Sequence, residues 1–268
     1  MTTVVSLDVV DLGIAATLLI VDAGLSIWLG LKLERRLLIS AVRMVLQLLM
    51  IALVLKGLFA LASPAWTGLA ALIMILFAGR EAMARQDRRF LGLWGYGLGT
   101  TAMLTSSMLV TVFALTTQIR PDPWFDPRYA IPILGMILGN TMTGVSLGLQ
   151  GLSSGAWTER RGIEAQLALG ANRWEAMRGV GRKAMTAALT PIVNSMSASG
   201  IVFLPGMMTG QILAGVDPVE AVKYQILIMF LIAGGTGFGS VVAVYGGIAR
   251  LTDARHRLRL DRLAPAKN

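Results

Sequence analysis

Apolar residues along the chain gather into long runs, and short polar stretches separate these runs. A helix of about twenty apolar residues can cross the ~30 Å hydrocarbon core of a membrane. Seven stretches fit or approach this length, at residues 12–31, 38–55, 65–79, 91–117, 129–152, 184–204 and 224–249. The pattern therefore predicts an all-α, polytopic membrane protein with about seven transmembrane helices, in which residues 1–268 form a single transmembrane domain.

One segment between the fifth and sixth runs breaks this pattern. Residues 156–183 carry nine charged side chains, so this segment is expected to lie in water. Ile163, Leu167, Leu169 and Gly170 share one apolar stripe at helical spacing, and the charges surround it. The segment is therefore predicted to be an amphipathic helix beside the membrane, with a surface on which a soluble partner can dock.

The composition supports a membrane protein over a nucleic-acid-binding one. Hydrophobic residues make up 55% of the chain and charged residues only 15%, which separates it from soluble globular domains. A net charge of +9 could indicate nucleic-acid binding. However, the basic residues lie in short loops between apolar runs, with few aromatic residues among them. Membrane topology explains these residues better, so lipid is the expected surrounding and no nucleic-acid partner is expected.

The basic residues also predict the orientation of the chain. Twenty of the 24 Lys and Arg residues fall on one side of the predicted spans. The other side holds only Lys56, Arg120, Arg128 and Lys223. Because cytoplasmic loops carry the excess of basic residues, the N-terminus is predicted to lie outside. The segment 156–183 and the basic tail 250–268 are predicted to lie in the cytoplasm.

No residue pattern in the sequence indicates an enzyme. The chain lacks the G-x-x-x-x-G-K-[ST] loop that holds nucleotide phosphates, and it has no cysteine and a single histidine. That histidine, His256, lies in the basic tail and is expected to be solvated. A metalloenzyme or a Ser-His hydrolase would need more histidine, so neither is expected, and no cofactor is expected on this chain. If ATP drives the protein, a separate chain hydrolyses it.

A motif inside residues 156–183 resembles the E-A-A-x-x-x-G loop of ATP-binding-cassette permeases. The matching positions are Glu164, Ala165, Gly170, Ala171 and Trp174. The resemblance implies a coupling helix that inserts into a groove of an ATPase subunit. Lys183 departs from the pattern, because those loops usually carry a proline there. The alternative is an ordinary surface helix between two spans.

Two longer stretches, IPILGMILGNTMTGVSLGL (131–149) and VFLPGMMTGQILAGVDPVEAVKYQI (202–226), resemble the most distinctive parts of the FetB-type permeases. The first half is similar through Arg43, Gln47 and residues 54–56. The resemblance implies a bacterial inner-membrane iron exporter that works as a homodimer. Two copies of a FetA-like ATP-binding subunit would then hold the ATP and Mg. Plant relatives are linked to aluminium tolerance and to nucleotide-sugar export, so another exported solute is the alternative.

Four strongly polar side chains fall at similar depth in four of the predicted spans. A helix rises ~1.5 Å per residue, so a residue about ten positions into a span lies near the midplane. The residues at this depth are Asp22, Gln47, Asn140 and Asn194. They are predicted to line a substrate path, or alternatively to form hydrogen bonds between helices. Asp22 could instead couple an ATPase-independent secondary transporter or channel to an ion gradient.

Methionines in the FetB-like stretches add a second candidate for the substrate path. Met136, Met207 and Met208 carry thioethers, which favour soft ions such as Cu(I). Methionine is also a flexible packing residue in apolar helices, and packing is the alternative for most of the 15 methionines. The sequence identifies no metal from these residues.

Two local patterns predict packing and capping. Glycines on the fifth predicted span recur every four residues or nearly so, which predicts close helix packing there. These glycines are Gly135, Gly139, Gly144 and Gly148. Asp217 precedes Pro218 and is predicted to cap the helix that the proline starts. Residues 206–222, between the last two spans, form either an outer loop or a re-entrant segment.

Overall fold

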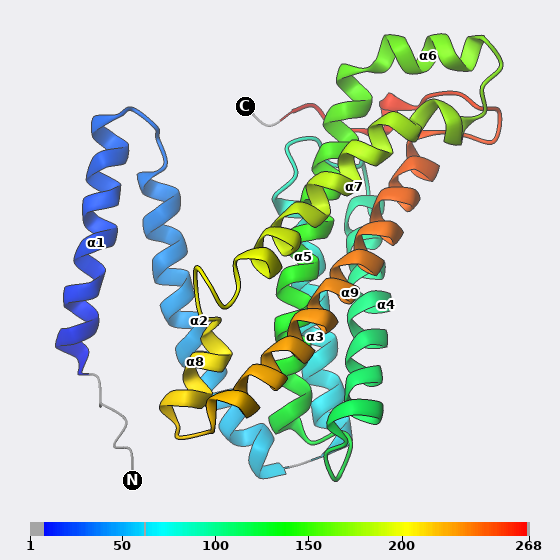
Figure 1. The fold of residues 1–268 in the computed structure, drawn as a ribbon. Helices are drawn as coiled ribbons and strands as arrows, with labels where there is room; N and C mark the ends of the chain where they lie inside the picture. The colour runs from blue at the N-terminus through cyan, green and yellow to red at the C-terminus, as the bar shows by residue number, and fades with distance from the viewer. Residues whose placement is uncertain (1–7, 62, 267–268) are drawn as a thin grey trace.

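The protein is all-helical in the computed structural model, which describes residues 8–61 and 63–266 (Figure 1). Its α-helices are α1 (Val9–Trp28), α2 (Glu34–Leu61), α3 (Pro64–Ala84), α4 (Trp94–Phe113), α5 (Pro127–Thr158), α6 (Arg160–Ala168), α7 (Arg173–Ala198), α8 (Gly206–Leu213) and α9 (Pro218–Leu251). A π-helical segment, η1 (Ala114–Ile119), extends α4, and a 3₁₀ turn, η2 (Leu260–Arg262), lies in the tail. Within the described residues no β-strand forms, so the predicted all-α class is confirmed.

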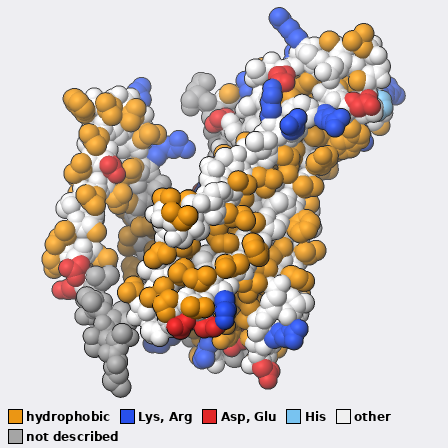
Figure 2. Space-filling view, viewed as in Figure 1, with side chains coloured by type: hydrophobic (Ala, Val, Ile, Leu, Met, Phe, Trp, Pro, Cys, Tyr) orange, Lys and Arg blue, Asp and Glu red, His pale blue; other side chains and the backbone are white. Residues whose placement is uncertain are grey.

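Six helical segments are long and apolar enough to cross a membrane. They are α1, α2, α3, α4 with its π-helical extension, α5 and α9. Figure 2 shows hydrophobic side chains over the middle of the visible face, with charged side chains gathered toward its two ends. This distribution suits a protein whose middle contacts lipid and whose ends contact water. The prediction of several transmembrane helices is confirmed by these six.

The predicted sixth span, 184–204, has different boundaries in the structure. Its helix, α7, already begins at Arg173 and ends at Ala198. The charged residues 173–183 therefore form the first turns of α7, and α7 is not among the six helices that are apolar enough. The expected single helix over 156–183 is wrong for the same reason, because this segment contains the end of α5, then α6, then the start of α7.

A capping box explains why a new helix begins in the middle of that segment. The side-chain oxygen of Asn172 accepts hydrogen bonds from the backbone N–H groups of Trp174 (2.9 Å) and Glu175 (3.0 Å). The carboxylate of Glu175 accepts one in return from the backbone N–H of Asn172 (2.9 Å). This reciprocal pair is a strong helix start, so the chain breaks before Arg173.

Aspartate–proline pairs begin two of the long helices. Asp217 accepts hydrogen bonds from the backbone N–H groups of Val219 (2.9 Å) and Glu220 (3.3 Å), and Pro218 starts α9. The predicted capping role of Asp217 is confirmed. Asp126 and Pro127 start α5 in the same way. Each pair satisfies a backbone donor and presets φ for the first turn.

The core of the bundle lies around α5, which contacts α3, α4, α7 and α9. Ile137, Val145, Leu149 and Leu152 of α5 are completely buried. The α1–α2 hairpin stands to one side of this bundle (Figure 1). On α2 only Leu58 is buried, so the hairpin offers apolar surface on nearly every side. A helix that is apolar all round and unburied is suited to lipid or to another protein.

The glycine repeat on α5 packs against helices of the same chain. A Cβ atom at Gly144 would lie 2.6 Å from Thr236 Cγ2 and 3.1 Å from the carbonyl oxygen of Ala188. A Cβ atom at Gly139 would meet no atom within 4 Å. The predicted close packing is therefore confirmed at Gly144, where α5 meets α7 and α9.

Replacing Gly144 with valine should destabilise the protein by about 1–3 kcal/mol, because the added atoms have no room between α7 and α9. Thermal unfolding of the purified protein in detergent would measure this as a lower Tm. Gly139→Val is the matched control, because it makes the same change on the same helix at an open position. An equal loss of stability in both variants would contradict the packing argument.

Candidate functional site

The candidate site is the short helix α6, which lies across one end of the helical bundle (Figure 1). Ile163 is only 3% exposed and packs into the main core cluster, and Leu167 packs against the same cluster. An ion pair between Glu159 and Lys183 (2.8 Å) joins the two helices that flank α6. These contacts hold α6 on the bundle, while the residues between them face outward.

The turn that follows α6 projects its apolar residue away from the protein. Gly170 adopts φ +95°, a left-handed conformation that is strained for residues with a side chain. Leu169, just before it, is 89% exposed. The sequence pattern placed Leu169 on one apolar stripe with Ile163, but the structure separates the two, because α6 ends at Ala168 and the turn points Leu169 outward. An exposed leucine beside a glycine turn can enter an apolar groove, because the turn itself adds no side-chain bulk.

The other residues of the coupling motif surround this turn. Glu164 is exposed and forms an ion pair with Arg160 (2.9 Å), and Ala165 is exposed beside it. Ala171 is half-buried in the turn. The ring of Trp174 lies 6.1 Å from that of Tyr245 on α9, at an angle of 33°. The structure thus brings the five predicted coupling residues to one end of the bundle.

The basic tail folds back beneath this site. A β-bridge between Thr252 and Leu258 closes a small hairpin. At its tip the Nδ1 atom of His256 accepts a hydrogen bond from the backbone N–H of Arg173 (3.1 Å), at the start of α7. His256 is exposed, as the sequence predicted, and this hydrogen bond additionally connects the tail to the first residue of α7. The lone position of this histidine in the sequence gave no signal of the contact.

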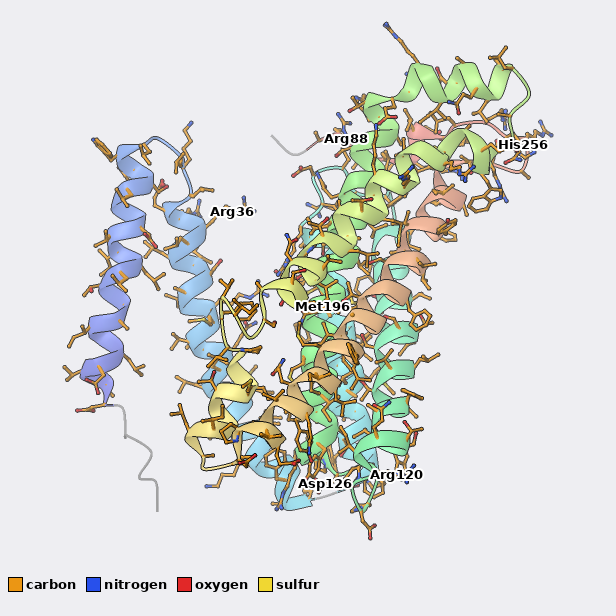
Figure 3. The ribbon with its side chains drawn as sticks, in the orientation of Figure 1. Arg36, Arg88, Arg120, Asp126, Met196 and His256 are labelled. Carbon is orange, nitrogen blue, oxygen red and sulfur yellow. The ribbon has the colours of Figure 1, made fainter. Side chains whose placement is uncertain are left out.

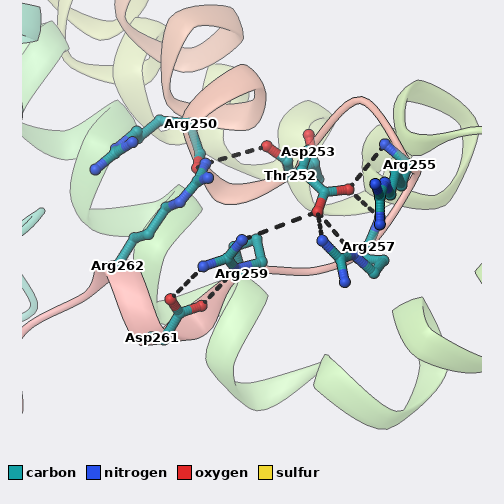
Figure 4. A network of polar contacts seen from close by, with 8 residues as sticks. All are labelled: Arg250, Thr252, Asp253, Arg255, Arg257, Arg259, Asp261 and Arg262. Atoms are coloured by element: carbon teal, nitrogen blue, oxygen red, sulfur yellow. Dashed lines mark hydrogen bonds and ion pairs between the residues drawn. The ribbon is translucent and has the colours of Figure 1, made fainter.

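Asp253 organises the hairpin, as Figure 4 shows. Its carboxylate accepts hydrogen bonds from the backbone N–H groups of Arg255 (3.0 Å) and Arg257 (2.9 Å), and it forms an ion pair with the Arg257 guanidinium (2.7 Å). The backbone N–H of Arg257, helped by its guanidinium, lowers the pKa of Asp253 from 3.8 to about 2. The ionised carboxylate is therefore favoured in the folded hairpin.

The tail should resist proteolysis at neutral pH and lose this resistance as the pH falls through about 2. A carboxylate with a lowered pKa in the folded state stabilises that state above its ordinary pKa, and protonation removes the effect. Asp253→Asn should therefore expose the tail to trypsin at pH 7. Asp261→Asn is the control, because Asp261 lies outside the hairpin that Thr252 and Leu258 close and its carboxylate pairs with the Arg259 guanidinium. Equal cleavage of Asp253→Asn and the unmodified protein would contradict this role.

The structure shows no polar contact among the four described residues that were predicted to lie at similar depth in the membrane. Asp22 and Gln47 lie exposed on the α1–α2 hairpin, whereas Asn140 and Asn194 lie exposed on α5 and α7. Asn140 donates a hydrogen bond to the carbonyl oxygen of Met136, one turn earlier (2.9 Å). No hydrogen bond or ion pair connects any two of the four in the described part of the chain. Their role in a substrate path stays a prediction.

The three methionines of the predicted path lie near two different parts of the bundle. Met136 on α5 and Met207 on α8 are half-buried and pack against the second core cluster. Met208 instead lines a cavity between α8 and its neighbours. In residues 8–61 and 63–266 no group of three His, Cys, Asp or Glu side chains could hold a metal ion. A metal cargo would therefore need other ligands here.

The two ends of the bundle match the predicted distribution of basic loops. Figure 3 shows Arg36, Arg88 and His256 toward the end that carries α6, and Arg120 with Asp126 at the opposite end. The sequence assigned Arg36, Arg88 and the tail to one side and Arg120 to the other. Loops that were predicted to share a side of the membrane therefore share an end of the molecule.

Comparison with known proteins agrees with this architecture. The sequence model described as uncharacterised protein family UPF0014 matches residues 9–252. The chain belongs to the UPF0014 family. UPF0014 membrane protein slr1647 of Synechocystis is 40% identical over 232 residues, which cover 85% of this chain and 87% of the relative. No solved structure matches this UPF0014 protein.

Two further UPF0014 relatives have names that describe a function. The probable iron export permease protein FetB of Escherichia coli is 33% identical over 257 residues, which cover 94% of this chain and 95% of FetB. The protein ALUMINUM SENSITIVE 3 of Arabidopsis thaliana is 33% identical over 216 residues, which cover 81% of this chain and 77% of that protein. The resemblance to FetB-type permeases is confirmed over nearly the whole chain.

Proposed function

We propose that this chain is the permease subunit of an ATP-driven exporter. The observation that carries the proposal is the α6 turn, where Leu169 and Gly170 project from the end of a membrane bundle. A turn of this shape can enter a groove on a soluble subunit and transmit its movement to α5 and α7. Two copies of the chain would bind two copies of a FetA-like ATP-binding subunit, which would hold ATP and Mg.

Iron is the proposed cargo, because the FetB relative is named an iron export permease. The name of the Arabidopsis relative points to aluminium instead, so a different solute, such as a nucleotide sugar, is the alternative. This chain itself would not be an enzyme, since ATP hydrolysis would take place on the partner. Its proposed place is the bacterial inner membrane.

The orientation follows from the same proposal, because ATP is available only in the cytoplasm. The end with α6 and the tail would face the cytoplasm, and the N-terminus would lie outside. Together, α7, the residues that follow it and α8 would provide one more membrane crossing, which would bring the total to seven. A cysteine introduced at Asp122 should react with an impermeant thiol reagent in intact cells, whereas one at Arg161 should not. The reverse labelling would reject this orientation.

Reconstitution with a cognate FetA-like ATP-binding subunit would test the function directly. We expect the two proteins to purify together and to hydrolyse ATP faster when iron or another cargo is added. A permease that moves solute without any ATPase would be a secondary transporter. Asp22 favours that second candidate, because its carboxylate has no hydrogen-bond or ion-pair partner in the described residues. Transport that follows a proton gradient without ATP would support it.

A further inference from the structure

A cavity of about 520 Å³ lies where the helical structure is interrupted between α7 and α9. It is bordered by the end of α7, the link 199–205, α8 and the first half of α9, and it is open to the surroundings on one side. Three methionines line it, namely Met196, Met208 and Met229, and Gln225 lines it as well. Figure 3 shows Met196 near the lower end of α7, about midway along the molecule. We call these four residues and the space between them the thioether pocket.

The lining of the thioether pocket narrows the chemistry of its ligand. The remaining described residues of the lining are apolar or small: Ser199, Gly200, Leu204, Pro205, Val222, Ile226 and Phe230. No Lys or Arg lines it that could bind an anion, and no Asp, Glu or His that would suit a hard or borderline cation. Thioether sulfurs are the ligands that soft cations prefer.

Gln225 gives independent support for a ligand here. Its side chain is only 8% exposed, and its Oε1 atom is buried without a hydrogen-bond partner among the described residues. An unpaired buried amide oxygen is unfavourable, because no hydrogen bond offsets the loss of its hydration. The oxygen is not exposed to the cavity in this conformation, so a bound cation would satisfy it after a rotation of the Gln225 side chain.

The broken end of α7 adds further oxygen atoms near the pocket. The backbone N–H of Gly200 bonds to the carbonyl oxygen of Phe203 (2.9 Å), and that of Val202 bonds to Ala198 (3.0 Å). The carbonyl oxygens of Met196 and Ser197 consequently receive no hydrogen bond within the described part of the chain. Free carbonyl groups at the C-terminal end of a broken membrane helix stabilise cations.

We propose that the thioether pocket binds a soft monovalent cation of the Cu(I) and Ag(I) class. Met196, Met208 and Met229 would supply sulfur ligands, and Gln225 would supply an oxygen. That this cation is also carried across the membrane rests on the proposed permease function, but its binding does not. Methionines that serve only for packing would bind no cation, and this outcome is part of the test.

Binding of Ag(I) to the purified full-length chain tests the proposal, because silver does not change its oxidation state during the measurement. Equilibrium dialysis followed by elemental analysis gives the silver bound per chain. The pocket variant replaces Met196, Met208 and Met229 with leucine, which keeps the bulk and removes the sulfur. We expect this variant to lose one tightly bound Ag(I), with an affinity lower by at least about tenfold.

A control variant makes the same three changes elsewhere, at Met44, Met50 and Met108. This control should bind silver like the unmodified chain. Gln225→Leu should weaken silver binding. Fe(II) binding should be the same in all variants. Unchanged silver binding in the pocket variant would overturn the proposal, as would an equal loss in the control. Gel filtration and thermal unfolding would show that each variant is folded.

Co-purification with the ATP-binding subunit separates this inference from the proposed function. Suppose that the unmodified chain binds no silver, and that the pocket variant binds the ATPase and transports iron normally. This result would overturn the soft-cation site and leave the proposed function in place. Silver binding in a chain that recruits no ATPase would leave the pocket in place and reject the ATP-driven exporter.

Discussion

Leu169→Glu should abolish stimulation of the partner ATPase while the protein still inserts and folds. Leu169 is 89% exposed at the end of α6, so its replacement removes no packing within the chain. A charge placed in a partner's apolar groove would be desolvated, and the affinity for the partner should fall by more than about tenfold, or ~1.4 kcal/mol. Gly170→Trp should have the same effect, because φ +95° and a close approach both favour glycine.

Co-purification and ATP turnover would measure this loss of coupling. Leu93→Glu is the matched control, because Leu93 is 86% exposed just before α4 and lies outside the α6 turn. Glu164→Arg is a second test, since it would replace the ion pair with Arg160 by two like charges. If Leu169→Glu and Gly170→Trp bind and stimulate the partner normally, α6 is an ordinary surface helix.

Asp22→Asn should reduce cargo-stimulated ATP turnover to the basal level without reducing partner binding. Asp22 is exposed on α1, and no hydrogen bond or ion pair within residues 8–61 and 63–266 depends on its charge. A carboxylate inside a membrane is unfavourable by at least ~2.5 kcal/mol, which favours a functional reason for its presence. Asn140→Leu should act in the same direction if both residues line one path.

The control for this experiment is Asp122→Asn, in the connection between η1 and α5. If Asp22 and Asn140 only hold helices together, their replacement should lower thermal stability and leave cargo stimulation intact. Asp22→Asn with normal cargo stimulation would remove Asp22 from the substrate path.

Local chemistry made several elements of the fold predictable. The spans followed from apolar runs, and Asp217 with Pro218 correctly predicted the start of α9 because capping depends only on neighbouring residues. The start of α7 was missed, although Asn172 and Glu175 form a capping box. The apolar stripe of residues 163–170 favours a longer helix and competes with this local signal in the sequence.

The sequence predicted where in the chain the candidate site lies, but it did not predict how its side chains are oriented. The motif placed Glu164 and Gly170 at one end of the bundle, where the structure has them. The outward direction of Leu169 depends on where α6 ends, and the support from His256 depends on a contact between residues 83 positions apart. Gln225 gave no signal either, because the burial of its oxygen results from the packing of α8 and α9.

Because α7 is one long helix, a movement at its α6 end would displace its other end. One helix, which contains Pro191, runs from the capping box beside the α6 turn past Met196 of the thioether pocket to Ala198. Its 26 residues rise ~1.5 Å each, a length of about 39 Å, so a tilt of roughly 5° at the α6 end would displace Ala198 by about 3 Å. A displacement of that size exceeds the length of a metal–ligand bond. A small rotation of the coupling end would therefore be enough to part the ligands of a bound ion.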